Sequence, residues 1–159
     1  MPRTAICLAL VVSAFAGAAS ADELQLYVNG RFGASALVPK AWASLPPPEN
    51  GDGLVFVSPD QRARITVSGS FNLGQSENGV VQPLLPVEGA RLTYSRQGPG
   101  WAVSSGVKDA TIFYRKVMVS CKGQIANDLI IEYPAAEKAA YDGLVGRIAA
   151  SMRGGCGIY

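Results

Sequence analysis

The residues of this chain that are best suited to chemistry are a serine–lysine pair, a few carboxylates, and two tryptophans accompanied by arginines. The chain contains no histidine, which removes Ser-His-Asp and Cys-His catalysis and the usual acid–base group near neutral pH. Ser105 and Lys108 fit the S-x-x-K spacing of a nucleophile and its base. A helix would place both side chains on one face, but residues 101–108 read as a strand. We therefore interpret the pair as polar residues at the end of a strand.

The positions of the carboxylates favour structural ion pairs over an acid–base catalytic site. Asp128 and Glu132 fall on one face of a predicted strand, opposite Arg115 or Lys116 on the preceding strand. The acidic segment 49–53 does not match the spacing of a calcium loop. We predict no metal site and no cofactor.

The tryptophans and arginines are the candidates for a binding surface. Trp42 and Trp101, with Arg96 and Arg115, are residue types that dominate binding hot spots. We favour Trp101 and Arg96, because they flank the turn at residues 98–100. The alternative is that both tryptophans belong to the core or its edge.

The first twenty-one residues predict where the protein works. Arg3 precedes an apolar run at residues 4–16, and Ala19 and Ala21 form an A-x-A cleavage site. The apolar run is too short to span a bilayer. We predict a signal peptide at residues 1–21, one domain at residues 22–159, and a periplasmic or secreted protein with no membrane insertion after processing.

The cysteines and the net charge support that interpretation. Cys7 leaves with the signal peptide, so Cys121 and Cys156 remain and are predicted to form a disulfide in an oxidising compartment. The formal net charge of +2 falls by one when Arg3 is removed. Such a balance argues against nucleic-acid binding.

Short strands separated by turn residues dominate the chain. The predicted strands are residues 24–28 and 31–38 around Asn29 and Gly30, 54–58 and 63–70 around Pro59 and Asp60, 91–97 and 101–108 around residues 98–100, and 110–121 and 125–133. The register of the last hairpin stays open, because a two-residue and a three-residue loop turn opposite faces inward. A single helical turn is possible at residues 80–85.

Residues 134–153 are predicted to form the long helix of the fold. Its apolar stripe includes Tyr141, Leu144, Val145, Ile148 and Met152. A row of small residues beside the stripe (Ala139, Gly143, Gly146 and Ala150) suggests a close approach to the sheet. The predicted fold class is α+β, an antiparallel sheet with the C-terminal helix packed on one face.

The order of these elements resembles the PsbP-like fold, and in particular exported bacterial proteins of that type without an assigned activity. The resemblance rests on residues 37–39 (LVP) followed by Trp42, residues 51–53 (GDG) before 56–60 (FVSPD), and residues 131–134 (IEYP) leading into a helix that ends near Ser151. It spans most of residues 31–153. The resemblance implies an accessory or binding subunit, and it assigns a role to no single residue.

Two functions follow from the sequence. The first is an exported, non-enzymatic module that binds an envelope protein or a cell-surface component. The alternative is a small periplasmic hydrolase or lyase that uses carboxylate, tyrosine or Ser-Lys chemistry. A strongly shifted pKa in a cleft would favour the enzyme, and an exposed apolar or Trp/Arg-lined surface would favour the binding module.

Overall fold

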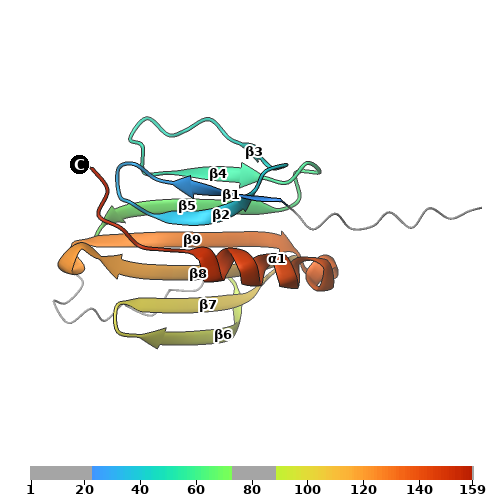
Figure 1. The fold of residues 1–159 in the computed structure, drawn as a ribbon. Helices are drawn as coiled ribbons and strands as arrows, with labels where there is room; N and C mark the ends of the chain where they lie inside the picture. Colours follow the sequence, from blue (N-terminus) through green and yellow to red (C-terminus); the bar gives the residue numbers. More distant parts are fainter. Residues whose placement is uncertain (1–22, 73–88, 159) are drawn as a thin grey trace, which may run out of the picture.

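The structure is a computed structural model that describes residues 23–72 and 89–158. The predicted signal peptide and the possible helical turn at residues 80–85 lie outside the described residues. One large antiparallel sheet is accompanied by a two-stranded hairpin and a C-terminal helix (Figure 1). The α+β class predicted from the sequence is therefore confirmed.

In the described residues, nine strands form the two sheets. They are β1 (Leu24–Val28), β2 (Ser35–Pro39), β3 (Ala43–Ser44), β4 (Gly53–Val57), β5 (Arg64–Phe71), β6 (Arg91–Gly98), β7 (Trp101–Lys108), β8 (Thr111–Ser120) and β9 (Ile125–Pro134). β1 pairs with β2, and the large sheet has the order β3-β4-β5-β9-β8-β7-β6. The last long strand, β9, thus lies between β5 and β8.

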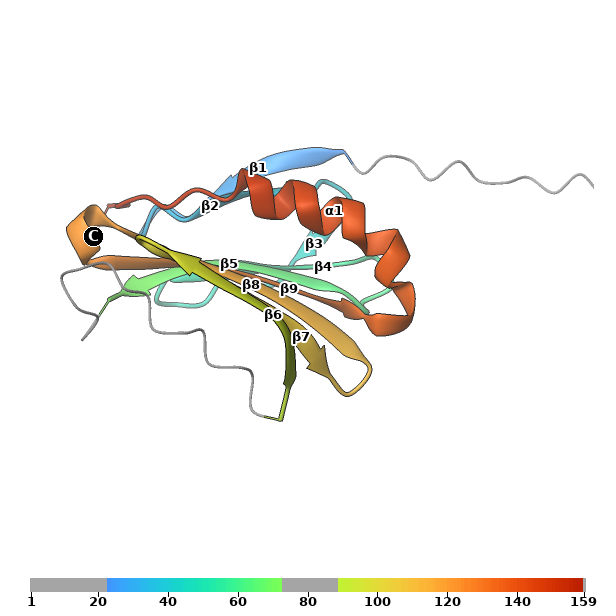
Figure 2. The same cartoon turned by 90° about the horizontal axis from the view of Figure 1, so that it is seen from below.

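One face of the large sheet carries the main core. Figure 2 shows the β1–β2 hairpin and helix α1 (Lys138–Ser151) on the same side of the sheet. Alternate residues of β5 and β9 point toward them, including Ile65, Val67, Leu129 and Ile131, which are almost completely buried. Burial of such side chains is the main stabilising contribution to a domain of this size.

Helix α1 buries the apolar stripe that its sequence predicts. Leu144, Val145 and Ile148 belong to the core. Its beginning differs from the prediction: Pro134 ends β9 with extended backbone, and a 3₁₀ turn (Ala135–Glu137) precedes the helix. The row of small residues also differs, because it faces solvent; a Cβ added at Gly143 or Gly146 would meet nothing within 4 Å.

Two connections differ from their predicted lengths. Val28 pairs with Ser35, so residues 29–34 form the β1–β2 turn in place of Asn29 and Gly30 alone. The Asn29 side chain stabilises this longer turn, since its Oδ1 accepts the Phe32 N–H at 2.7 Å. Ser120 pairs with Ile125, which places residues 121–124 in the β8–β9 turn and settles the register that the sequence left open.

The predicted disulfide is present. Cys121 in the β8–β9 turn is bonded to Cys156 in the tail after α1, with their Cα atoms 5.2 Å apart. The buried Asn127 side chain joins three parts of the chain here. Its Nδ2 donates to the Phe32 carbonyl at 2.8 Å, and its Oδ1 accepts from the Ser120 hydroxyl at 2.7 Å and the Gly155 N–H at 3.0 Å.

Candidate functional site

The outer strands β6 and β7 present an open surface beside α1. Every residue of β6 except Gly98 is exposed, and α1 packs chiefly on β2, β9 and β8. Cross-strand partners share a face of the sheet, so the strand register identifies the side chains on the α1 side. We call this surface the outer-strand face; it comprises Tyr94, Arg96, Trp101, Val103, Ser105, Tyr114 and Lys116.

A row of hydroxyl-bearing side chains lines the first part of the outer-strand face. Tyr94 pairs with Ser105, which pairs with Tyr114. Together with Val145 of α1 they line a mainly apolar pocket of about 450 Å³. Burial, and secondarily the neighbouring Tyr94, raises the pKa of Tyr114. Tyr114 therefore remains a neutral hydroxyl at physiological pH.

A cationic row comes next along the strands. Arg96 pairs with Val103, which pairs with Lys116. The Lys116 ammonium donates to the Ala149 carbonyl of α1 at 2.9 Å. Burial, and then the nearby Arg153, lowers the pKa of Lys116. The positive charges of Lys116 and Arg153 thus lie close enough to interact at this end of α1.

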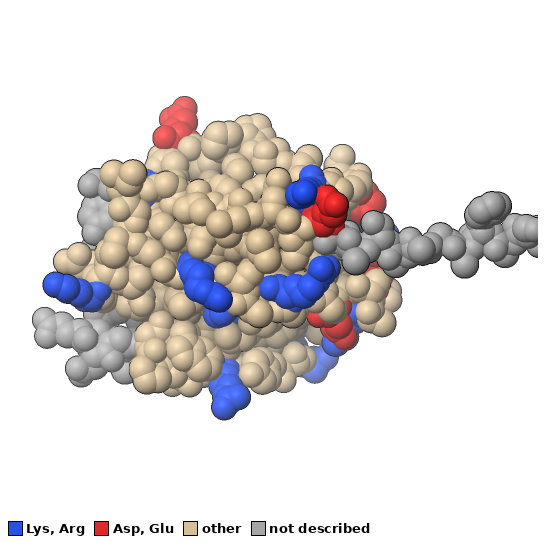
Figure 3. Space-filling view, in the orientation of Figure 1, with Lys and Arg blue, Asp and Glu red and all other residues tan. Residues whose placement is uncertain are grey.

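The distribution of charge on this side of the molecule is uneven. Figure 3 shows Lys and Arg side chains spread across the side that carries α1, with acidic atoms toward its margins. Within residues 23–72 and 89–158, Arg96, Lys116 and Arg153 take part in no salt bridge. This part of the surface is therefore locally positive, although the chain is nearly neutral overall.

Trp101 completes the outer-strand face. It pairs with Gly98 on β6 and Met118 on β8. A Cβ at Gly98 would lie 2.6 Å from the Trp101 Nε1, so the indole packs directly on this glycine. Trp101 is partly buried, and its aromatic surface follows the cationic row.

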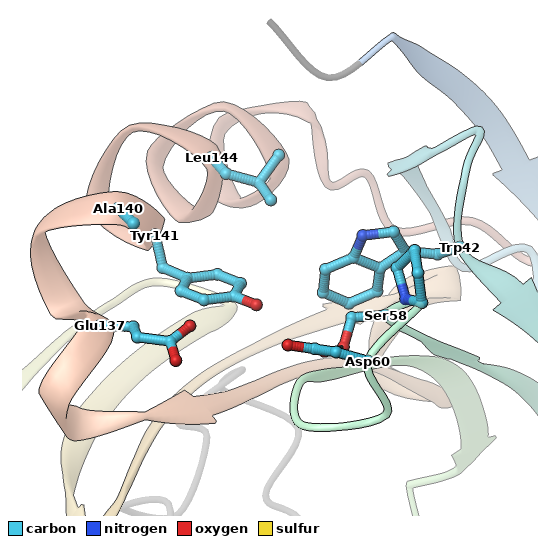
Figure 4. A pocket seen from close by; sticks show the side chains of 8 residues that line it. Trp42, Ser58, Asp60, Glu137, Ala140, Tyr141 and Leu144 are labelled. Atoms are coloured by element: carbon cyan, nitrogen blue, oxygen red, sulfur yellow. Dashed lines mark hydrogen bonds between the residues drawn. The ribbon is translucent and has the colours of Figure 1, made fainter. Parts of the chain in front are cut away.

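A second pocket lies on the opposite side of α1. Trp42, Ser58, Asp60, Glu137 and Tyr141 surround an open hollow of about 420 Å³, and Leu144 of α1 lies above it in Figure 4. The Tyr141 ring stacks on Tyr133 at a centroid distance of 5.0 Å. Because Tyr133 lines the first pocket, this pair separates the two hollows.

The carboxylates of the Trp42 pocket are held by structural bonds. The Ser58 hydroxyl donates to Asp60 at 2.6 Å, and the Arg62 backbone N–H does so at 3.1 Å. Chiefly through these bonds, the pKa of Asp60 falls to about 2. Arg62 also pairs with Glu137 and so ties the β4–β5 turn to the start of α1. An acid with so low a pKa is a poor proton donor or acceptor at neutral pH.

The four predicted contact residues lie in three places. Trp42 precedes β3, and five strand spacings, about 24 Å, separate β3 from the β7 strand of Trp101. Arg96 and Trp101 share the outer-strand face. Arg115 points to the opposite face of the sheet, where its Nε donates to Asp128 at 2.9 Å. The four residues therefore do not line one groove, and their role in binding stays a prediction.

Ser105 and Lys108 are not brought together. Ser105 lies on the α1 side, where its hydroxyl donates to the Phe113 carbonyl at 2.8 Å. Lys108 lines a separate small pocket with Glu132. Within the described ranges, no group of three or more Cys, Asp or Glu side chains is placed to hold a metal ion.

Sequence reasoning missed Tyr94, Tyr114 and Lys116 as members of the site. Two short turns carry the signal that identifies them. Gly98 pairs with Trp101 across Pro99 and Gly100, and Lys108 pairs with Thr111 across the next turn. Pairing the residues of the two strands one by one, starting at each turn, places Tyr94 opposite Ser105, and Ser105 opposite Tyr114.

The comparisons with known proteins agree with this architecture. No protein-family model matches the sequence, and no characterised protein matches it in sequence. The solution structure of cyanobacterial PsbP (CyanoP) from Synechocystis sp. PCC 6803 is similar, with a TM-score of 0.62 and 15% identity, over 87% of this chain and 96% of that one. The crystal structure of the Saccharomyces cerevisiae Ran-binding protein Mog1p is also similar, with a TM-score of 0.53 and 10% identity, over 83% of this chain and 95% of that one. The chain has the PsbP-like fold.

Proposed function

We propose that this protein is an exported, non-enzymatic accessory module that binds a protein partner in the cell envelope. The observation that carries the proposal is the outer-strand face, which combines aromatic side chains with cations beside a pocket. Its β6 residues Tyr94 and Arg96 are exposed. Within the described residues, neither Arg96 nor Lys116 forms a salt bridge. Tyrosine, tryptophan and arginine are the residue types that contribute most to protein–protein binding. Trp101 and Arg96 are the proposed contact residues on this face.

The comparisons support a binding role in general terms. Mog1p, which has a similar fold, is described as a Ran-binding protein. Folds host many functions, so this likeness supports the class of function and names no partner for this chain. The proposal leaves Trp42 and Arg115 outside the contact surface, because they lie at a distance and on the opposite face respectively.

The proposed location rests on the N-terminal sequence. Residues 1–21 have the pattern of a signal peptide, and no described helix is long and apolar enough to cross a membrane. N-terminal sequencing of protein from the exported fraction should begin at Asp22. Recovery of the chain with Met1 intact from the cytosol would contradict export.

Photo-crosslinking in intact cells tests the binding role. Benzoyl-phenylalanine replaces Tyr94 on the outer-strand face or, as the matched control, Arg64 on the opposite face of β5. We expect a discrete crosslinked species from position 94, identified by mass spectrometry, and none from position 64. Adding Arg96→Ala and Trp101→Ala to the position-94 protein should remove the crosslink without unfolding the chain. A crosslink that persists in this folded variant would contradict the proposed surface.

A further inference from the structure

We propose that the outer-strand face binds an extended, acidic segment of the partner, with an apolar residue, an acidic residue and a second apolar residue at alternate positions. This inference rests on the proposed function and specifies the partner's chemistry. The occupant is a strand-like peptide whose acidic side chain meets Arg96 and Lys116. Its two apolar side chains meet the tyrosine-lined pocket and Trp101.

The order of the rows carries the inference. On β6, β7 and β8 the residues of successive rows are two positions apart: Tyr94 and Arg96, Val103 and Ser105, Tyr114 and Lys116. Trp101, in the third row, lies two positions before Val103 on β7. The rows are therefore about 7 Å apart along the strands.

An extended ligand matches that spacing with its alternate side chains. Residues i, i+2 and i+4 of a strand lie on one face at the same interval of about 7 Å. In a helix, residues two apart point in different directions and advance only about 3 Å. A segment that runs along β7 thus places three successive same-face side chains over the three rows.

The middle row requires a negative charge. Arg96 is exposed and Lys116 is partly buried, and in the described part of the chain neither forms a salt bridge. Their floor is Val103, which is only 9% exposed. A carboxylate bound above this apolar floor would accept charge-assisted hydrogen bonds. Arg153, close enough to lower the pKa of Lys116, adds to the positive potential.

The outer rows provide apolar contacts. Val107, Ile112 and Val145 form apolar walls of the pocket beside Tyr94 and Tyr114. The charged residues at its rim, Lys138 and Asp142, neutralise each other at 2.7 Å. The pocket therefore suits an uncharged side chain such as phenylalanine or leucine, and Trp101 offers a second aromatic contact.

Helix α1 determines the direction of the ligand. It runs beside β8 and β9 in the views of both Figure 1 and Figure 2. Val145 lines the tyrosine pocket and Ala149 contacts Lys116, so the helix follows the rows in the same order as β8. The helix thus forms a wall that aligns an extended segment with the strands.

Three blocked peptides test the spacing and the charge. The first is Gly-Phe-Ser-Glu-Ser-Phe-Gly, the second carries Gln in place of Glu, and the third, Gly-Phe-Glu-Ser-Ser-Phe-Gly, moves the acid by one position. Each is titrated into the ¹⁵N-labelled, disulfide-bonded protein. We expect the first peptide to shift the Trp101 indole N–H and the amides of β6 and β7. The other two should bind about tenfold more weakly, because a tenfold change in affinity corresponds to the loss of about one charge-assisted hydrogen bond.

A pair of matched variants assigns the charge effect to the cationic row. Arg96→Gln should reduce the preference of the protein for the Glu peptide over the Gln peptide. It should also reduce the dependence of that preference on salt. Arg64→Gln removes the same charge from an exposed position on the other face of the sheet, and should leave both unchanged. Neither side chain is buried, so both variants should fold.

The outcomes separate this inference from the proposed function. Equal binding of the three peptides, or no binding of any, would overturn the inference, and so would binding to phosphatidylglycerol vesicles in place of the peptides. If the position-94 crosslink forms nevertheless, the proposed function stands and only the peptide chemistry is wrong. If the crosslink is also absent, the proposed function itself fails.

Discussion

Arg115 and Lys116 are neighbours in the chain but face opposite sides of β8. Arg115 bonds Asp128 through both its Nε and its Nη2 on one face. Lys116 contacts the last turn of α1 on the other face and joins the cationic row. The sequence predicted a cross-strand pair with Asp128 or Glu132, and the pair with Asp128 is present. It could not assign the faces, because the register of the β8–β9 hairpin was open.

Replacing Arg115 with methionine tests whether this residue has a structural role or a role in binding the partner. The Asp128 side chain is only 16% exposed, so it would lose its charged partner in a largely buried position. We expect Arg115→Met to lower the free energy of unfolding by about 1–2 kcal/mol, measured by urea denaturation. The position-94 crosslink should remain. A lost crosslink at unchanged stability would instead make Arg115 a contact residue.

The Asp60 carboxylate predicts a component of acid sensitivity. Its pKa of about 2 lies below the ordinary value of 3.8, because Ser58 and Arg62 donate hydrogen bonds to the ionised form. A lowered folded-state pKa contributes stability above the unfolded value that is lost as the pH falls through the folded value. The stability difference between wild type and Asp60→Asn should therefore be constant above about pH 5 and shrink toward pH 2. Urea denaturation across this range tests it, and a constant difference would contradict the assignment.

At the scale of elements, hydrophobic alternation predicted most strands, and helical periodicity predicted the buried stripe of α1. Leu144, Val145 and Ile148 are buried as expected. The small-residue row was misassigned, because periodicity locates an apolar stripe but does not say which neighbouring flank meets the sheet. The two-residue strand β3 depends on its pairing with β4, which no local pattern encodes. The β1–β2 turn is longer than the Asn-Gly pair suggests, because the Asn29 side chain bonds the Phe32 N–H.

The solvent-facing glycines of α1 predict a gain in stability on substitution. Gly146 lies inside the helix, is exposed, and has open space where a Cβ would project. Because glycine costs conformational entropy in a helix, Gly146→Ala should stabilise the protein by about 0.5–1 kcal/mol. Thermal or urea unfolding tests this, with Gly155→Ala as the contrast, since a Cβ there would lie 2.6 Å from the Gly33 carbonyl oxygen. Loss of stability in Gly146→Ala would mean that this flank of the helix is packed.

At the scale of the whole molecule, the site depends on the strand order more than on any single motif. β9 lies between β5 and β8, which places β7 and β6 at the edge of the sheet, while α1 packs chiefly on β2, β9 and β8. A sequence pattern of period two reports that a strand is half-buried, but not which strand lies beside it. The sequence thus predicted Arg96 and Trp101 as contacts from their residue types, while the rows around them follow from topology and register.

The C-terminal tail connects helix α1, the β1–β2 hairpin and the large sheet. Ser35 of β2 forms a bridge with Arg153, and the Ile158 N–H donates to the Gly30 carbonyl at 2.9 Å. The tail and the β1–β2 turn approach each other closely, since a Cβ added at Gly33 would lie 2.7 Å from the backbone of Gly155. The disulfide anchors this tail to the β8–β9 turn at a sequence separation of 35. The tail therefore holds the β1–β2 hairpin against the large sheet.

Removal of the disulfide should release that connection. In the chain-entropy model, a loop of this length contributes roughly 3–4 kcal/mol by restricting the unfolded chain. We expect Cys121→Ser with Cys156→Ser to lose about that much in urea denaturation, and reduced wild type to match the double variant. Amides of β1 and β2 should also exchange with solvent faster, because the tail that braces them is no longer anchored. Thiol titration of the denatured, unreduced protein should find no free thiol in residues 22–159. Two free thiols, or a double variant as stable as the oxidised wild type, would contradict this role of the disulfide.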